Sequence, residues 1–116
     1  MELLKQTTLG KRRPITEIER IEAMLQYANL LVSAWKGNEL VGVARSLTDF
    51  QYCCYLSDLA VREDYQKQGI GKALIAETEK SLSSKAKIIL LSAPQAVDYY
   101  PHIGFTQHSS AWLREV

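Results

Sequence analysis

The sequence predicts a single α/β domain, residues 1–116, with a mostly antiparallel, twisted sheet and helices on both faces. Two observations carry this prediction. Three β-rich segments follow one another with short turns between them, which is typical of an antiparallel meander. A helical segment then separates the third of them from another apolar segment, which predicts a crossover to a parallel strand. A chain of 116 residues is long enough to bury one hydrophobic core.

Charge and composition exclude several classes of protein. The chain has 14 basic and 13 acidic side chains, a balance that argues against a general binder of nucleic acid or of anionic membranes. It has neither an apolar run that could span a bilayer nor a signal-peptide pattern at Met1, so we expect no membrane partner and a cytoplasmic location. The adjacent Cys53 and Cys54 are too few for a Cys-x-x-Cys metal site, and we expect two reduced core residues and no metal.

The N-terminal segment is predicted to hold two helices. Met1 to Leu9 is compatible with a short helix, which Gly10 to Pro14 would end in a basic, solvated loop. The spacing Thr16-x-x-Glu19 matches a capping box and predicts the start of the second helix. Apolar side chains then recur at helical spacing and predict a face that packs against the core. They are Ile18, Ile21, Leu25 and Ala28.

The meander follows directly. Its three strands are predicted at Leu30 to Lys36, Leu40 to Leu47 and Tyr52 to Val61, which are rich in apolar, aromatic and branched residues. The turns between them fall at Gly37 to Glu39 and at Thr48 to Gln51, both rich in turn-forming residues.

A helix and a buried strand are predicted next. The helix runs from about Gly69 to Ser83. Lys87 to Ala93 is a continuous apolar run, as expected of a strand covered on both faces, and Pro94 would end it.

The C-terminal part is predicted to hold a short helix and a last strand. The helix spans Gln95 to Tyr100 and would be cut off by Pro101. Thr106 to Val116 is predicted to form a final strand or strand pair, with Trp112 as its largest apolar anchor.

One stretch has the composition of an anion-binding loop. The apolar strand end Leu59-Ala60-Val61 leads into Gln66 to Lys72, where Gly69 and Gly71 carry no Cβ and let the backbone approach a ligand closely. A glycine turn at the start of a helix presents unpaired backbone N–H groups and the positive end of the helix dipole. Such a site suits phosphate.

Two known phosphate-binding patterns do not fit this loop. A P-loop needs glycine where Gln66 stands and serine or threonine where Ala73 stands, which excludes a nucleoside-triphosphate binder of that type. A dinucleotide-binding fingerprint needs glycine or alanine at Leu74. A strand-to-helix turn that uses glycine only for its geometry stays as the alternative interpretation.

The pattern that fits is Gln66-x-x-Gly69-x-Gly71 after a strand ending Leu-x-Val. It resembles motif A of the GNAT superfamily of acetyl-CoA-dependent N-acetyltransferases, Arg/Gln-x-x-Gly-x-Gly/Ala. The resemblance implies that acetyl-CoA is the co-substrate, that the loop holds its pyrophosphate and that the strand end pairs with the pantetheine arm between splayed parallel strands. It also implies an oxyanion-binding backbone N–H near Leu59. The implied coenzyme-binding residues are Leu59, Ala60, Val61, Gln66, Lys67, Gln68, Gly69, Ile70, Gly71 and Lys72.

A second stretch, Ala96 to Phe105, resembles the pattern Ala-x-x-Phe-Tyr-x-x-x-Gly-Phe of many GNAT proteins. Tyr99 and Tyr100 take the Phe-Tyr places. The resemblance implies that Tyr100 protonates the departing thiolate, since a phenol keeps its proton at neutral pH. Tyr99 is the less favoured alternative, and packing alone is the structural explanation for either side chain.

Of the predicted catalytic groups, the base that deprotonates the amine is the one that the sequence identifies least clearly. Asp58 stands on the third strand just before the loop and is the candidate base. It could equally cap a loop or orient the acceptor amine, and water could relay the proton instead. We expect His102 and His108 to be loop or surface residues.

The expected function is acetyl transfer from acetyl-CoA to a primary amine of a small molecule or peptide, by direct attack of the amine. The alternative is a non-catalytic acyl-CoA-binding or sensor module of the same fold. Compared with the family pattern, we expect the usual first strand to be missing. This would leave Leu30 to Lys36 at the edge of the sheet and invite pairing with another chain, as in a homodimer.

Overall fold

The computed structural model describes residues 16–116, apart from the side chain of Gln95. The expected helix at Met1 to Leu9 and the loop at Gly10 to Pro14 therefore lie outside the described residues.

One four-stranded sheet forms the centre of the molecule, in the order β1-β2-β3-β4. Strand β1 (Leu30–Lys36) pairs antiparallel with β2 (Glu39–Thr48), which pairs antiparallel with β3 (Cys53–Val61). Strand β4 (Lys87–Ile89) pairs parallel with β3. The predicted fold class is confirmed, because a meander leads through a helical crossover to a parallel strand.

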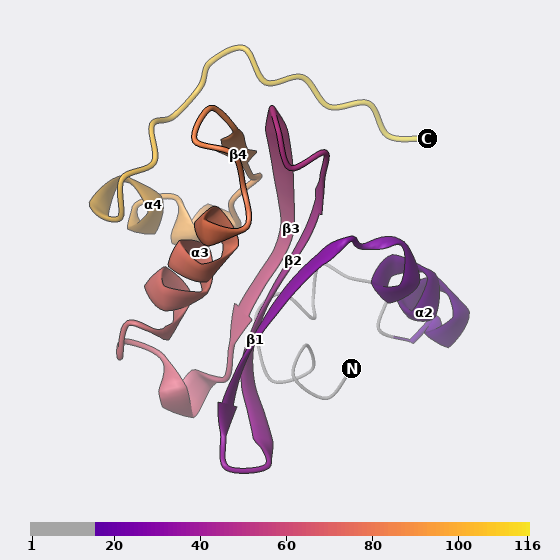
Figure 1. Cartoon of the computed structure of the whole chain (residues 1–116), viewed down its shortest axis with the longest axis vertical. Coiled ribbons are helices and arrows are strands. Elements are labelled where there is room, and N and C mark those ends of the chain that lie inside the picture. Colours follow the sequence, from indigo (N-terminus) through magenta and orange to yellow (C-terminus); the bar gives the residue numbers. More distant parts are fainter. Residues whose placement is uncertain (1–15) are drawn as a thin grey trace.

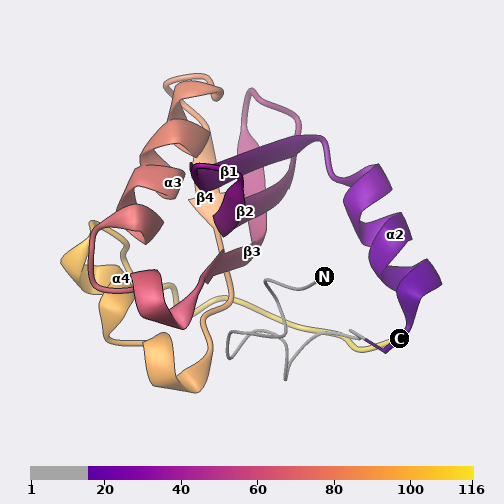
Figure 2. The ribbon, with the colours of Figure 1, turned by 90° about the horizontal axis from the view of Figure 1, so that it is seen from below.

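Helices cover both faces of this sheet (Figures 1 and 2). Helix α2 (Ile18–Tyr27) lies on one face, and α3 (Ile70–Lys80) and α4 (Tyr99–His102) lie on the other. Two short 3-10 turns, η2 (Glu63–Tyr65) and η3 (Pro94–Ala96), precede α3 and α4.

A β-bulge in β3 decides which side chains face which helix. Arg45 pairs with Asp58 and Ser46 pairs with Leu56, so Ser57 is an extra residue in β3. Before the bulge, Leu56 packs in the layer under α3. After it, the even-numbered Ala60 packs against α2 instead. An extra residue of this kind leaves the ladder locally unpaired and changes the phase of the strand.

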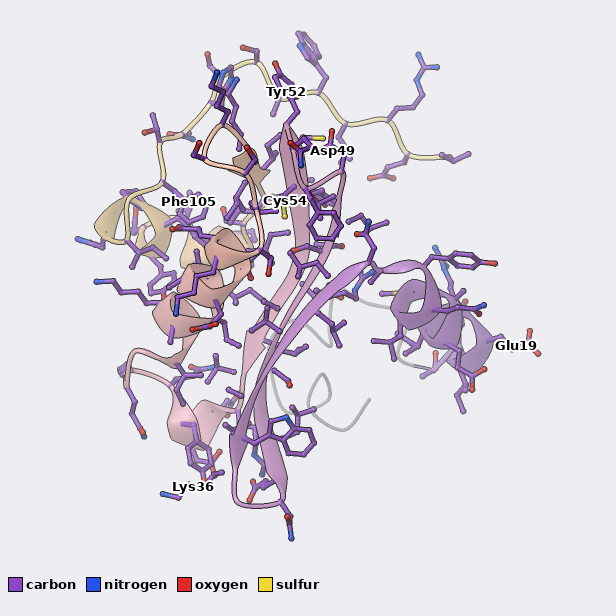
Figure 3. The ribbon with its side chains drawn as sticks, viewed as in Figure 1. Glu19, Lys36, Asp49, Tyr52, Cys54 and Phe105 are labelled. Carbon is purple, nitrogen blue, oxygen red and sulfur yellow. The ribbon has the colours of Figure 1, made fainter. Side chains whose placement is uncertain are left out.

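The layer under α3 is apolar and closely packed. Its fully buried side chains are Ala44, Leu56, Leu74 and Ile75. Cys54 lies in the interior of the molecule (Figure 3) and is completely buried. At Gly42 the side chains of α3 lie close to the sheet, because a Cβ there would lie 3.1 Å from Leu74 Cδ1 and 3.2 Å from Ile70 Cγ2. A side chain at this point of β2 would have to displace these two side chains by a few tenths of an ångström.

The turn between β2 and β3 is held by one carboxylate. Asp49 Oδ1 accepts hydrogen bonds from the backbone N–H groups of Gln51, Tyr52 and Cys53, at 3.0, 2.8 and 3.1 Å. These N–H donors, Tyr52 first, lower the pKa of Asp49 below its ordinary value. Figure 3 shows Asp49 and Tyr52 at the end of the sheet opposite Lys36.

The start and the packing face of α2 differ from the prediction. Glu17, not Thr16, precedes the helix, and no side chain caps it, so the predicted capping box was wrong. Ile21 is buried and Met24 packs beside it, whereas Ile18 and Leu25 are 62% and 48% exposed. The helix meets the sheet only along this narrow line, which leaves two of the predicted contact positions in solvent.

The cysteines and the fourth strand also differ. Cys54 is a core residue as predicted, but Cys53 is exposed. Regular pairing in β4 ends at Ile89 rather than Ala93, and the side chains of Ile89 and Leu91 are 53% and 45% exposed. The apolar run is thus covered on one face only.

The region after β4 departs most from the sequence prediction. Pro101 lies inside α4 instead of ending a helix before it. It occupies the first turn, where a backbone N–H would have no intrahelical partner, so proline costs no hydrogen bond. No strand forms over Thr106 to Val116, and Trp112 is 95% exposed rather than an anchor. This segment runs past the end of the sheet without joining it (Figure 1).

Candidate functional site

Strand β3 is paired on both sides over only part of its length. Strand β4 pairs with Cys53, Cys54 and Tyr55 and with no later residue of β3. Among the described residues, no strand continues the sheet beside Leu56 to Val61 on that side. The parallel pairing therefore ends at Tyr55, and a strand edge that no other strand covers can pair with an extended ligand.

A hydrogen bond connects the loop at Gln66 to the end of β3. The side-chain amide of Gln66 donates a hydrogen bond of 3.0 Å to the carbonyl oxygen of Val61. Lys67 and Gly69 have left-handed backbone conformations, with φ of +63° and +81°. A side chain at Gly69 would be strained in that conformation, although the space around it is open. This glycine is required by the shape of the loop.

The loop leads into α3, whose N-terminus is not capped by a side chain. Gly69 precedes α3, and its carbonyl accepts the first helical hydrogen bond, from the N–H of Ala73 at 3.0 Å. No side chain caps this end. The N–H groups of Ile70, Gly71 and Lys72 have no intrahelical acceptor, because they belong to the first turn. They form, with the helix dipole, a site of the kind that binds phosphate groups.

Gly71 is crowded by a side chain from α4. A Cβ on Gly71 would lie 3.0 Å from the hydroxyl oxygen of Tyr99. The absence of a side chain at Gly71 thus accommodates this hydroxyl group at the start of α3, a reason for glycine that the sequence did not reveal.

The two tyrosines of α4 have different surroundings. Tyr100 is half-buried and packs against the apolar layer under α3. Its ring meets those of Phe105 and Tyr99 edge to face, at centroid distances of 5.5 and 5.3 Å. The side chain of Tyr99 is 40% exposed. Both predicted motifs therefore meet in space, with α4 beside the start of α3.

Asp58 is buried on the opposite face of the sheet. It is 3% exposed and lies on the face toward α2, because the bulge at Ser57 changes the phase of β3. Its Oδ2 atom lies 2.5 Å from Nε of Arg45, which is itself 6% exposed. The sequence predicted Asp58 on the third strand but not its arginine partner.

Arg45 connects the bulge to α2. Its Nη2 donates to the hydroxyl of Ser57 at 2.9 Å, and its Nη1 donates to the carbonyl of Met24 at 3.1 Å. A charged residue among the alternating apolar residues of β2 was the available sequence signal. The guanidinium group fixes the position of Asp58 relative to both the bulge and the helix.

Other polar features lie apart from this site. His102 is exposed in the last turn of α4, and His108 contacts Ser110 in the exposed C-terminal segment. Within residues 16–116, no group of three or more His, Cys, Asp and Glu side chains could hold a metal ion. No helix of this described part has the length and apolar character needed to cross a membrane.

A hollow of about 490 Å³ lies at the other end of α3. Its walls come from the end of α3, from β4 and from the segment around Phe105, and none of the predicted site residues lines it. The open edge of β3 and the glycine loop, not this hollow, carry the predicted chemistry.

Comparisons with known proteins agree on one family. Residues 10–115 match the family model described as an acetyltransferase (GNAT) domain. The chain is 33% identical over 97 residues to the "Uncharacterized N-acetyltransferase ycf52" of Gracilaria tenuistipitata var. liui, which covers 81% of this chain and 53% of that protein. The chain thus spans about half the length of this curated relative.

Solved structures agree with this match. A GNAT family acetyltransferase from Streptococcus pneumoniae superposes with a TM-score of 0.70 at 25% identity, covering 84% of this chain and 80% of that chain. A GNAT family acetyltransferase from Elizabethkingia anophelis, solved with acetyl-CoA bound, superposes with a TM-score of 0.62 at 26% identity. That match covers 78% of this chain and 62% of the other.

Proposed function

Since the chain belongs to the GNAT acetyltransferase family, we propose that it transfers an acetyl group from acetyl-CoA to a primary amine by direct attack. The observation that carries the proposal is the half-paired β3, whose open edge leads within a few residues to the uncapped start of α3. A ligand with an extended amide-bearing arm and a pyrophosphate matches both features, because the arm can pair with a strand edge and the phosphates suit a helix N-terminus.

The coenzyme would be held mainly by backbone groups. In this proposal Leu59, Ala60 and Val61 pair with the pantetheine arm. The pyrophosphate lies against the loop residues Gln66, Lys67, Gln68, Gly69, Ile70, Gly71 and Lys72. The hydrogen bond from Gln66 to Val61 supports this arrangement, because it holds the loop close to the end of the strand. Lys67 and Lys72 add positive charge near the phosphates.

The reaction replaces a carbon–sulfur bond by a carbon–nitrogen bond and requires two proton transfers. Acetyl-CoA supplies the activated thioester. The amine nitrogen bonds to the carbonyl carbon while the carbon–sulfur bond breaks, so the amine loses a proton and the sulfur gains one. Tyr100 is proposed to donate that proton to the sulfur, and a backbone N–H near Leu59 to stabilise the carbonyl oxygen. No residue acts as nucleophile.

Asp58 is proposed to receive the amine proton or to orient the amine. Its ion pair with Arg45 holds the carboxylate in one position on the face of the sheet toward α2. The pH–rate profiles of the wild type and Asp58→Asn separate these roles. Loss of the acidic limb in the variant identifies Asp58 as the base, whereas an unmoved limb with a raised acceptor KM leaves it as an orienting residue.

The acceptor, the assembly and the location stay at the level of prediction. The amine can belong to a small molecule or to a peptide. A homodimer through β1 remains a prediction, consistent with the position of β1 at the edge of the described sheet. The cytoplasmic location is likewise a prediction from the sequence.

Two measurements test the proposal. Titration calorimetry measures binding of acetyl-CoA, and release of free thiol measures turnover on a panel of primary amines. We expect Tyr100→Phe to reduce turnover by about 10²-fold or more with little change in coenzyme binding. The matched control is Tyr27→Phe, on the exposed side of α2, where the ring is 72% exposed.

Three outcomes are decisive. Binding with turnover that Tyr100→Phe abolishes supports the proposal in full. Binding without turnover on any amine of the panel favours the alternative, a non-catalytic acyl-CoA-binding or sensor module. A wild type that does not bind acetyl-CoA contradicts both.

A further inference from the structure

We propose that Tyr99 is a second ligand-binding tyrosine: its hydroxyl donates a hydrogen bond to the coenzyme pyrophosphate at the start of α3, while Tyr100 serves the sulfur. This inference rests on the proposed function, because it concerns the same coenzyme. The two adjacent tyrosines would then contact different parts of the coenzyme, Tyr99 the pyrophosphate and Tyr100 the sulfur.

The Tyr99 hydroxyl is positioned at the start of α3. The hydroxyl oxygen of Tyr99 lies 3.0 Å from where a Cβ on Gly71 would be. Gly71 belongs to the first turn of α3, whose N–H groups have no intrahelical acceptor. The hydroxyl therefore stands at the edge of the only part of α3 that is suited to an anion, and it can donate in the same region as the loop N–H groups.

The Tyr99 hydroxyl is available to a ligand. Tyr99 is 40% exposed, and within residues 16–116 no hydrogen bond engages its hydroxyl. A phenol O–H that donates to a phosphate forms a charge-assisted hydrogen bond, stronger than a bond between two neutral groups. Because a phenol stays neutral at physiological pH, it adds a donor without repelling the anion.

Ring contacts fix the orientation of the two tyrosines. The Tyr99 ring meets the Tyr100 ring edge to face, with an interplanar angle of 72°. Tyr100 is in turn fixed by Phe105, at 77°, and by the apolar layer under α3. The two neighbouring tyrosines consequently point in different directions, and only the hydroxyl of Tyr99 is placed at Gly71. A fixed donor of this kind needs little reorganisation when the ligand binds.

The test compares two conservative variants in the full chain. Calorimetry with coenzyme A measures Kd for the wild type, Tyr99→Phe, Tyr100→Phe and the control Tyr27→Phe. We expect Tyr99→Phe to raise Kd roughly tenfold, the effect of losing a hydrogen bond to a charged group. Tyr100→Phe and Tyr27→Phe should stay within about twofold. In turnover assays Tyr99→Phe should raise KM for acetyl-CoA and leave kcat nearly unchanged.

A double-mutant cycle tests the contact itself. In the wild type, Gly71→Ala introduces a methyl group against the Tyr99 hydroxyl and should weaken coenzyme binding by displacing it. In the Tyr99→Phe background the hydroxyl is already absent, so the same substitution should cost clearly less. Equal costs in the two backgrounds would mean that the two residues act independently and would overturn the inference.

Failure of this inference can be told apart from failure of the proposed function. If the wild type binds coenzyme A and Tyr99→Phe binds it equally well, the inference is wrong and the proposed function stands. If the wild type does not bind coenzyme A, both are wrong. If Tyr99→Phe lowers kcat and leaves Kd unchanged, Tyr99 acts at the sulfur and the proposed division is contradicted.

Discussion

The two faces of the sheet are packed by different kinds of residue. Under α3, the buried residues are apolar or small, and the helix approaches until it touches the sheet at Gly42. Under α2, a much smaller apolar contact around Ile21 and Ala60 lies beside a buried ion pair between Arg45 and Asp58. Apolar packing depends on shape and volume, whereas a buried ion pair depends on both of its members being present.

This difference matches the proposed division of the chemistry. The α3 face carries the glycine loop and the tyrosines, which would hold and protonate a large, chemically constant coenzyme. The α2 face carries Asp58, which would meet the acceptor amine.

The largest expected effect comes from breaking the ion pair. Arg45→Met leaves the buried carboxylate of Asp58 without its cation, and we expect a loss of about 3–5 kcal/mol in the free energy of unfolding. Urea denaturation followed by circular dichroism measures it. The matched control is Arg45→Met combined with Asp58→Leu, which removes both charges and should recover most of the loss. A double variant as unstable as the single one would show that Arg45 acts through Met24 and Ser57 instead.

A smaller effect is expected on the apolar face. Gly42→Ala brings a methyl group to 3.1 Å from Leu74 Cδ1 and 3.2 Å from Ile70 Cγ2, so these side chains of α3 must move by a few tenths of an ångström. We expect about 1–3 kcal/mol of destabilisation from this overpacking. Gly42→Ala combined with Leu74→Val should be less costly than the sum of the single changes, since the pair shares one contact. A stabilised Gly42→Ala would mean that strand propensity outweighs packing here and that the two faces are less different than they look.

The smallest effect is expected at Asp49, which lies on the surface and belongs to neither face. Backbone N–H groups of Tyr52, Cys53 and Gln51 lower its pKa in the folded state. The charged carboxylate therefore contributes stability that is complete above the unfolded-state pKa and is lost as the pH falls through the lower folded-state pKa. We expect the urea midpoint of Asp49→Asn to lie slightly below that of the wild type at pH 7. The difference should shrink as the pH falls below about 4. A difference independent of pH would contradict this role.

Local patterns predicted the meander and the loop well. The bounds of β1 matched those predicted, because alternation and a glycine turn specify a hairpin within a few residues. The order of strand, glycine loop and helix was also predicted correctly, with Gly69 and Gly71 at the start of α3. In each case the residues that determine the structure are neighbours in the sequence.

Prediction failed where structure depends on distant partners. The residues from Thr106 onward have the composition of a strand, but no sheet edge pairs with them in the described structure. The contact of Tyr99 with Gly71 and the partner of Asp58 could not be predicted either, because they join residues 28 and 13 positions apart through the packing of separate elements. Pro101 was misjudged because the rule against proline in helices does not apply to the first turn.

The bulge at Ser57 divides β3 into two halves, in which the alternating side chains face opposite sides of the sheet. Along the sequence the buried positions alternate without interruption, at Cys54, Leu56, Asp58 and Ala60. They nevertheless belong to two different faces, because the phase changes at Ser57. An engineer who treats Cys53–Val61 as one alternating strand would place polar residues at Leu59 and Val61, in the apolar layer under α3. The two halves must be designed separately, so residues of β3 that face α2 after the bulge can be varied while Leu59 and Val61 stay apolar under α3.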